Sequence, residues 1–184
     1  MGLFSMIFKT AKEMDKQRFN EIDRQKKLQE KQNKINIQEK LVDEYFINLT
    51  KLYNEWGDAY NNNEELRESI DIEGELDAFL ENFDTGILLT NNLFDRVELL
   101  PDVYEVPKPV QQYIKASKEQ YLLNLEFHIK RDETIKNGVI EFLEKGEIVE
   151  HPPELVNQYL NKAHLHLETA QSNMVKARQS IHNI

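Results

Sequence analysis

Cysteine is absent from this chain of 184 residues, and glycine and proline are scarce, with six and five copies. Without cysteine the chain has no disulfide bonds, no zinc sites built on thiolates and no thiol nucleophile. So few glycines and prolines leave little of the turn chemistry that many short strands and hairpins require. No apolar run approaches the roughly 18 residues that a membrane-spanning helix needs. These absences favour an all-α protein.

Stretches rich in Lys, Glu, Gln and Leu fill the chain instead, and these residues favour helix. Hydrophobic residues make up 40% of the chain and charged residues 30%, which is enough apolar material for one core. We therefore predict an all-α fold, an antiparallel helical bundle or coiled coil with a long N-terminal helix. The bias toward Asn, Ile, Lys and Glu is typical of proteins from AT-rich bacterial or phage genomes.

The first predicted helix is the longest, because no proline occurs between Met6 and Tyr60 and Gly57 is the only glycine there. A helix of about fifty residues would be roughly 75 Å long. We predict that residues 1–40 form an amphipathic start and an extended, partly projecting helical arm. Residues 41–184 are predicted to form the bundle body, a single cooperative domain. The heptad seam of this helix consists of Leu28, Ile35, Val42, Leu49 and Trp56.

Turn and proline signals divide the middle of the chain. The three asparagines at 61–63 predict a turn, since Asn tolerates left-handed backbone angles and caps helices. Apolar spacing predicts helices over 64–83 and 87–100, with a break between them. Three prolines predict a loop over 100–108, because proline lacks the amide donor of a helix. Helical spacing then resumes over 110–145.

The last predicted helix, after Pro152 and Pro153, has the most regular apolar spacing in the chain. Small alanines alternate with larger residues along one heptad seam, which permits close approach of a neighbouring helix. We predict that this seam packs against an antiparallel neighbour, either the helix that starts at Val110 or the Trp56 end of the first helix. The seam consists of Val156, Leu160, Ala163, Leu167, Ala170, Met174, Ala177 and Ile181.

The sequence contains none of the motifs that commonly carry catalysis or cofactor binding. Metal-binding bundles use patterns such as Glu-x-x-His, and phosphate-binding loops use spaced glycines, and neither pattern occurs. We therefore predict no metal, no cofactor and no enzymatic activity. His128 and Asp132 are the one candidate pair, because a carboxylate four residues away would raise the affinity of the imidazole for a proton. The alternatives are a hydrogen-bonded polar layer that fixes helix register, or a face that turns toward solvent.

The net charge of −10 is distributed unevenly. Between Lys9 and Lys40 there are ten basic and six acidic residues, so this segment carries +4 and the remainder −14. Because nucleic acid is bound through Lys and Arg, the acidic remainder argues against direct nucleic-acid binding. Two interpretations of the acidic face are open: it is the solvated face of an ordinary amphipathic helix, or it imitates a phosphate backbone or receives a basic partner, for example the arm of a second copy. This face consists of Glu64, Glu65, Glu68, Asp71, Glu73, Glu75 and Asp77.

The N-terminus carries an apolar helical stripe beside Lys9 and Lys12, a pattern typical of helices that lie in a membrane interface. Over about a dozen residues it resembles the opening of the phage-shock and vesicle-inducing membrane proteins. The resemblance implies contact with a membrane surface, but the motifs that follow in that family are absent. The alternative is packing on the protein's own body or on a second copy. The N-terminal stripe consists of Leu3, Phe4, Ile7, Phe8, Ala11 and Met14.

These patterns predict a non-catalytic helical protein that binds other proteins or serves as a scaffold, and that associates with itself. We expect it in the cytoplasm, at the inner face of the membrane if the N-terminal stripe binds lipid. Two alternative functions remain open. One is a peripheral membrane-binding protein that uses the N-terminal helix, and the other is an acidic inhibitor or decoy of a nucleic-acid-binding protein.

Overall fold

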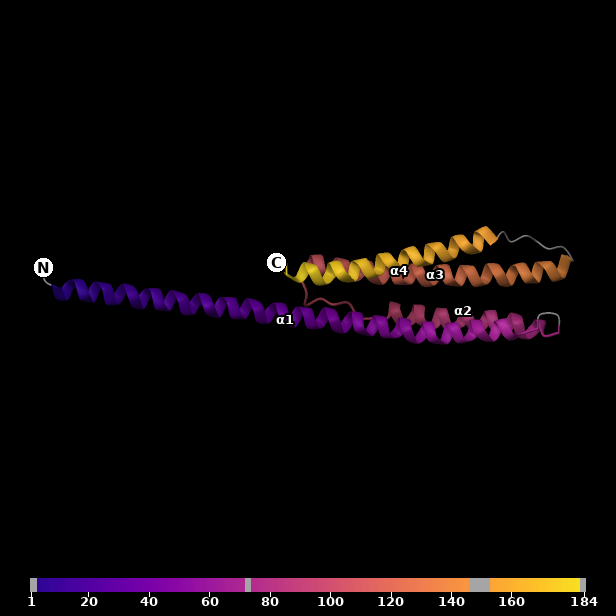
Figure 1. The fold of residues 1–184 in the computed structure, drawn as a ribbon, viewed down its shortest axis with the longest axis horizontal. Helices are drawn as coiled ribbons and strands as arrows, with labels where there is room; N and C mark the ends of the chain where they lie inside the picture. Colours follow the sequence, from indigo (N-terminus) through magenta and orange to yellow (C-terminus); the bar gives the residue numbers. More distant parts are fainter. Residues whose placement is uncertain (1–2, 72–73, 146–152, 183–184) are drawn as a thin grey trace. The chain divides into compact units, whose positions relative to one another are not determined.

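Four helices and no strands make up the described part of the protein, residues 3–71, 74–145 and 153–182 of a computed structural model (Figure 1). Within these ranges, side chains are described from Met14 onward, apart from that of Pro153. The predicted all-α helical bundle is confirmed. The helices are α1 (Leu3–Ser69), α2 (Leu76–Glu98), α3 (Lys108–Lys145) and α4 (Pro153–His182).

The chain divides into two compact units, Met1–Lys40 and Leu41–Ile184. In the first unit α1 is helical from Leu3 onward, and every side chain from residue 14 to residue 34 is exposed. Phe19 is among them, with 73% of its surface accessible to solvent. The core of the bundle therefore belongs to the second unit. Its largest fully buried side chains are those of Phe46, Phe83, Leu49, Leu125, Ile181 and Val42.

Within the second unit α1 and α2 run antiparallel and are held in register by buried polar pairs. The indole nitrogen of Trp56 on α1 donates to the hydroxyl of Thr90 on α2 (3.1 Å). Farther along α1, Asn63 pairs with Asn82 of α2. Each of these two amides donates to both the backbone carbonyl and the side-chain oxygen of the other, at 3.0–3.2 Å. A shift of either helix would leave these buried groups without partners, so the pairs fix the register.

The turn that the sequence predicts at residues 61–63 is wrong. α1 continues through these residues to Ser69, and the chain reverses between Ser69 and Leu76. Asn63 is buried, and its side chain bonds across to Asn82 of α2. The turn prediction rests on the local preference of asparagine for turns. In the folded protein the side chain of Asn63 has a buried hydrogen-bond partner on another helix, so Asn63 is accommodated within a continuous helix.

The predicted break between the helices at 64–83 and 87–100 is also wrong, because α2 runs through it without interruption. Gly86 is buried at this point. A Cβ added here would lie 3.1 Å from Nδ2 of Asn63 and 3.3 Å from Oδ2 of Asp132. Gly86 therefore permits close approach of α2 to α1 and α3, rather than ending a helix.

α3 and α4 lie side by side and run antiparallel (Figure 1). Ser117 Oγ donates to the backbone carbonyl of Ala170 (2.9 Å), and Asn124 Nδ2 donates to that of Ala163 (2.8 Å). Side chains of α3 reach the backbone of α4 because the seam residues there are small, and Ala163, Ala170 and Ala177 are 0% exposed. The rest of the seam includes buried Ile181 and the half-buried Val156, Leu160, Leu167 and Met174.

Residues 99–107 link α2 to α3, close to the loop predicted at 100–108. The ammonium group of Lys118 on α3 donates to the carbonyls of Glu98 (2.7 Å) and Leu100 (2.9 Å). These carbonyls belong to the C-terminal end of α2, where a positive charge is favourable. Val106, which belongs to this link, is buried. One lysine thus fastens the end of α2 to the side of α3.

Candidate functional site

A buried ionic cluster joins α1 to α3 at the centre of the bundle. Asp132 on α3 is 0% exposed and accepts hydrogen bonds from the hydroxyl of Tyr60 and from Arg131 Nε (3.1 Å) and Nη2 (2.9 Å). Arg131 Nη2 also donates to the hydroxyl of Tyr60 and to Glu64 on α1. The two carboxylates and the guanidinium give this cluster a formal charge of −1.

Burial and neighbouring charges set the protonation of this cluster. Burial raises the pKa of Tyr60, and the adjacent Asp132 raises it further, so the phenol stays protonated and donates to the carboxylate. Burial alone would lower the pKa of Arg131, but Tyr60, Asp132 and Glu64 outweigh it and the pKa is raised. The guanidinium therefore remains charged, and the cluster is a fixed ion pair rather than a proton donor.

The structure does not bring the candidate pair His128 and Asp132 into a hydrogen bond. Asp132 accepts hydrogen bonds from Tyr60 and Arg131, while Nδ1 of His128 is buried and has no hydrogen-bond partner among the described residues. The expectation that a carboxylate raises the affinity of this imidazole for a proton is wrong. Burial, with a smaller effect of Arg131, lowers the pKa of His128 to about 4. Geometry thus favours a polar layer over an acid/base pair.

A cavity of about 380 Å³ opens beside the ionic cluster, among α1, α3 and α4. α1 contributes one wall with an aromatic row in which neighbouring ring centroids lie 5.1 Å apart, from Tyr53 to Trp56 and from Trp56 to Tyr60. The ring of His128 meets that of Trp56 edge-on at 5.2 Å. The lining consists of Tyr53, Trp56, Gly57, Tyr60, Asn61, Glu64, His128, Arg131, Leu160, His164 and Leu167.

The described lining of this cavity holds no evident nucleophile. None of the described residues around the cavity is a serine or threonine, and the phenol of Tyr60 is held protonated. Nδ1 of His128, which has no hydrogen-bond partner among the described residues, is itself closed to solvent. Aromatic rings and polar groups that converge on one cavity are typical of ligand sites.

We expect acidification to destabilise the protein through His128. Its pKa is about 4 in the folded protein and 6.5 in an exposed imidazole, so the unfolded chain binds the proton more readily. The stabilising contribution is complete above pH 6.5 and is lost as the pH falls toward 4. Between pH 7 and pH 5 the loss is about 2 kcal/mol.

Urea unfolding at pH 7 and pH 5 measures this loss, with His128→Phe as the reference. The variant keeps every carboxylate, including Glu64, and also Arg131 and His164, the charged and titratable groups that face the imidazole. Its stability should therefore fall less than that of the wild type by about 2 kcal/mol. Equal losses in both proteins would contradict the lowered pKa.

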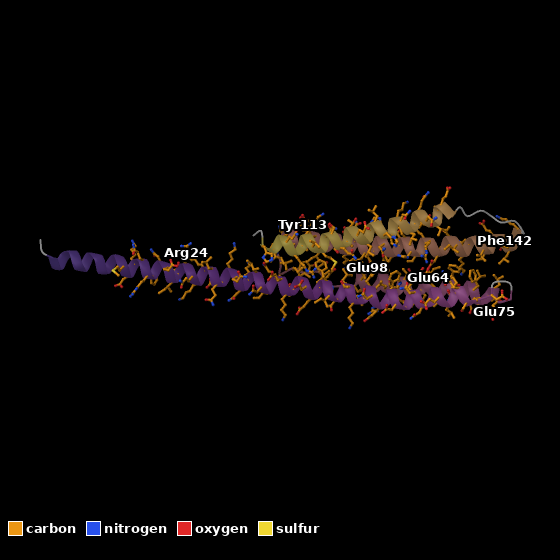
Figure 2. The ribbon with its side chains drawn as sticks, viewed as in Figure 1. Arg24, Glu64, Glu75, Glu98, Tyr113 and Phe142 are labelled. Carbon is orange, nitrogen blue, oxygen red and sulfur yellow. The ribbon has the colours of Figure 1, made fainter. Side chains whose placement is uncertain are left out.

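The predicted acidic face is only partly available to a partner. Glu64 is bound by Arg131, and Glu73 lies outside the described residues. Figure 2 labels Glu64 and Glu75, which belong to the end of the bundle where α1 leads into α2. The exposed members are Glu65, Glu68, Asp71, Glu75 and Asp77.

The N-terminal stripe falls mostly outside the described side chains. Leu3, Phe4, Ile7, Phe8 and Ala11 belong to α1, but their side chains are not described. Met14 is described and is 57% exposed. Membrane or protein contact through this stripe therefore stays a prediction. In the described ranges, no helix combines the length and the apolar character that crossing a membrane requires.

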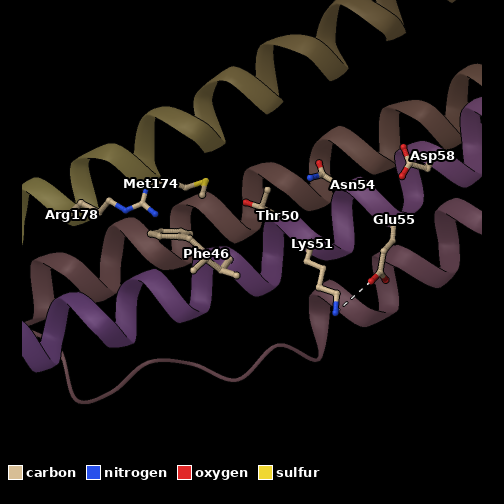
Figure 3. Close-up of a pocket in the computed structure, with 9 residues that line it drawn as sticks. Phe46, Thr50, Lys51, Asn54, Glu55, Asp58, Met174 and Arg178 are labelled. Atoms are coloured by element: carbon tan, nitrogen blue, oxygen red, sulfur yellow. Dashed lines mark ion pairs between the residues drawn. The ribbon is translucent and has the colours of Figure 1, made fainter.

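A second, shallower hollow of about 530 Å³ lies between α1 and α4 (Figure 3). Phe46 and Met174 supply its apolar side, and the guanidinium of Arg178 lies over the ring of Phe46, 5.6 Å from its centroid. Arg178 also pairs with Asp43 (2.7 Å). Figure 3 shows the further ion pair of this hollow, between Lys51 and Glu55 along α1. Lys51 and Glu55 thus pair within the lining, whereas Arg178 pairs with Asp43 outside it.

Residue spacing in the sequence points to His128 and Asp132, but it does not point to Tyr60, Arg131 or Gly57. Tyr60 and Asp132 are 72 residues apart in the chain, and no local spacing signals that contact. One feature of the sequence does mark the position of the cavity. The glycine at 57 interrupts a long run of helix-forming residues next to three aromatic residues, and this interruption marks a place where space is left open.

Among the residues that the structure describes, no group of three or more His, Asp or Glu is arranged to hold a metal ion. The candidate functional features of the described residues are thus the cavity of about 380 Å³ and the exposed side chains of α1 from residue 14 to residue 34. The family suggested by the N-terminal resemblance finds no support from further similarity. No protein-family model matches the chain, and neither a curated protein nor a solved structure is significantly similar to it.

Proposed function

We propose that this chain is a non-catalytic interaction protein that assembles with further copies of itself through residues 14–40 of α1, here called the arm. The observation that carries the proposal is the exposure of large apolar side chains along the arm. Phe19 is 73% exposed, Leu28 58% and Ile37 62%. A helix in water gains most of its stability by burying such side chains against a partner.

The heptad pattern of α1 supports the same proposal. Val42 and Leu49 occupy one heptad position and are both 0% exposed inside the bundle. The same position holds Ile35 and Leu28 in the arm, where Ile35 is half-buried and Leu28 is exposed. The apolar seam of α1 thus continues from the buried Leu49 and Val42 to the exposed Leu28 of the arm.

Charge favours a second copy as the partner. The segment from Lys9 to Lys40 carries +4, while the rest of the chain carries −14. The exposed acidic residues Glu65 and Glu68 lie in the same two turns of α1 as Leu66, which is itself 59% exposed. An acidic surface with an exposed apolar side chain close by in the helix complements an arm that combines basic residues with Phe19 and Leu28. The arm of one copy would therefore lie on the acidic face of the next.

Charge reversal should break this assembly, and reversal of both partners should restore it. We expect Arg24→Glu with Lys26→Glu to lower the mass measured by light scattering to that of the monomer at low salt. Glu65→Lys with Glu68→Lys should do the same, because each pair of changes replaces attraction by repulsion. A mixture of the two variants should assemble again, since the reversed arm complements the reversed face.

Lys108→Glu with Lys176→Glu is the matched control, because both lysines are exposed, lie outside the arm and change the net charge equally. This control should retain the mass of the wild type. A wild-type chain that is monomeric at every concentration would refute the proposal. So would arm variants that assemble as well as the control.

A further inference from the structure

The arm carries a row of positive charge on one face of α1, here called the basic stripe. Its members are four exposed residues at alternating spacings of three and four, a pattern that places side chains on one face of a helix. Lys27 pairs with Asp23 along the same helix (2.8 Å). The basic stripe consists of Arg24, Lys27, Lys31 and Lys34.

A stripe with the same spacing lies on α1 in the second unit, and it is here called the acidic stripe. Asp58 of this stripe lines the hollow of about 530 Å³, and Asn61 lines the cavity of about 380 Å³. A Cβ added at the adjacent Gly57 would meet nothing within 4 Å, so a second helix can approach α1 closely here. The acidic stripe consists of the exposed residues Asp58, Asn61, Glu65 and Glu68.

The two stripes match when the arm of one copy lies parallel to α1 of another copy, shifted by 34 residues. Three bases then face three acids, and each facing pair attracts. The fourth base, Lys27, faces the uncharged Asn61 and keeps its pair with Asp23. The facing ion pairs are Arg24 with Asp58, Lys31 with Glu65 and Lys34 with Glu68.

The neighbouring registers match less well. With the shift shortened by one heptad, Arg24 would face Lys51, and the two like charges would repel each other. With the shift lengthened by one heptad, Lys31 and Lys34 would lie beyond Ser69, where α1 ends. Charge therefore selects the shift of 34 residues among these registers.

The position of the basic stripe on α1 decides on which side a second copy lies. Arg24 and Lys31 occupy the same heptad position as Gln38 and Tyr45. Gln38 is 7% exposed and Tyr45 6%, so this position is the buried side of α1 where the helix enters the second unit. The second copy would therefore lie on the side of α1 that continues this buried side.

Orientation follows from the space that the bundle bodies need. An antiparallel arm would also set bases against acids, but Leu41 of one copy would then face Lys51 of the other. Both residues belong to the second unit, so two bundle bodies would compete for the same space. In the parallel orientation Leu41 lies beyond Ser69 of the other copy, and the bodies follow one another end to end.

We propose that copies of this chain assemble head to tail into an open-ended filament, in which the basic stripe of each copy lies parallel on the acidic stripe of the next. This inference rests on the proposed self-association and specifies its geometry. Each copy uses one stripe toward each neighbour, so the contact is heterologous, and a shift along the helix axis does not close it into a ring. Successive copies are displaced by about 50 Å, since a helix rises about 1.5 Å per residue.

Cross-linking between engineered cysteines tests the register, because the chain has no cysteine of its own. Single-cysteine variants of the full chain are mixed in pairs and treated with a short bis-maleimide. Arg24→Cys should cross-link to Asp58→Cys, and Lys34→Cys to Glu68→Cys. The exchanged pairs, Arg24→Cys with Glu68→Cys and Lys34→Cys with Asp58→Cys, are the matched controls. They should not cross-link, since the two acidic positions lie about 15 Å apart along α1.

Open-ended growth is tested by light scattering and electron microscopy of the wild type. The mass should rise with concentration beyond that of a dimer, and filaments should repeat about every 50 Å. A small fraction of the Arg24→Glu, Lys26→Glu variant should shorten the filaments, because such a copy accepts an arm but cannot extend its own. The same fraction of the Lys108→Glu, Lys176→Glu control should leave their length unchanged.

Two results would overturn the filament and leave self-association standing. One is preferential cross-linking of the exchanged pairs, and the other is a wild-type mass that stops at the dimer. Absence of every cross-link in a wild type that assembles would likewise reject this geometry. A wild type that stays monomeric would overturn this inference together with the proposed function.

Discussion

Replacing Asp132 with alanine is expected to lower the free energy of unfolding by about 3–5 kcal/mol. The carboxylate is 0% exposed and is the acceptor for both Tyr60 and Arg131. Its removal leaves the phenol without an acceptor and leaves the buried guanidinium with Glu64 as its only carboxylate partner. Removing one member of a buried ion pair leaves the charge of the other member poorly compensated. The loss of unfolding free energy should therefore exceed that caused by removing an ordinary hydrogen bond. Urea unfolding at pH 7 measures it.

Glu133→Ala is the matched control, since Glu133 is the next residue on α3 and is exposed. It should change the stability by no more than about 0.5 kcal/mol. Tyr60→Phe removes the hydrogen bond that the hydroxyl donates to Asp132 and the one that it accepts from Arg131, and it should cost about 1–3 kcal/mol. If Asp132→Ala were no more costly than Glu133→Ala, the ionic cluster would not hold α1 to α3.

Enlarging Ala170 to leucine is expected to cost about 3 kcal/mol. Ala170 is 0% exposed, and the backbone carbonyl of the same residue accepts from Ser117 at 2.9 Å. Three extra carbon atoms at this position cannot fit unless α4 moves away from α3. That movement would break the Ser117 hydrogen bond and also the one from Asn124 to the carbonyl of Ala163. Thermal or urea unfolding followed by circular dichroism gives the loss.

Gln171→Leu adds an apolar side chain to the neighbouring, exposed position of α4 and serves as the control. Its effect should be within about 0.5 kcal/mol of zero. A similar result for Ala170→Leu would mean that α4 does not approach α3 closely at this seam. An intermediate loss accompanied by retained helix content would indicate that α4 shifts along α3 rather than detaching.

The arm and the cavity beside Gly57 differ in size and in the side chains that they present. The arm presents exposed apolar side chains such as those of Phe19 and Leu28. The cavity beside Gly57 has a volume of about 380 Å³ and is lined by residues of the second unit. The two features therefore consist of separate residues, and charge reversal in the arm should leave the cavity unchanged.

Local spacing was sufficient to predict much of the fold. The α4 seam repeats through four heptads, and the loop before α3 is marked by prolines, because helix formation and helix breaking depend on neighbouring residues. The same local reasoning failed at residues 61–63 and at Gly86. There a partner from another helix decided the outcome, since Asn63 bonds to Asn82 and Gly86 packs closely against both α1 and α3.

By itself the sequence determined that the chain is helical, that alanines line one face of the last helix and that charge is split between a basic arm and an acidic remainder. These properties follow from residue type and from the 3.6-residue period. Only the tertiary structure decided that Asp132 accepts hydrogen bonds from Tyr60 and Arg131 rather than from His128, and that Gly57 faces open space. Residues some 70 positions apart meet only after the helices pack, so their chemistry is a property of the packed bundle.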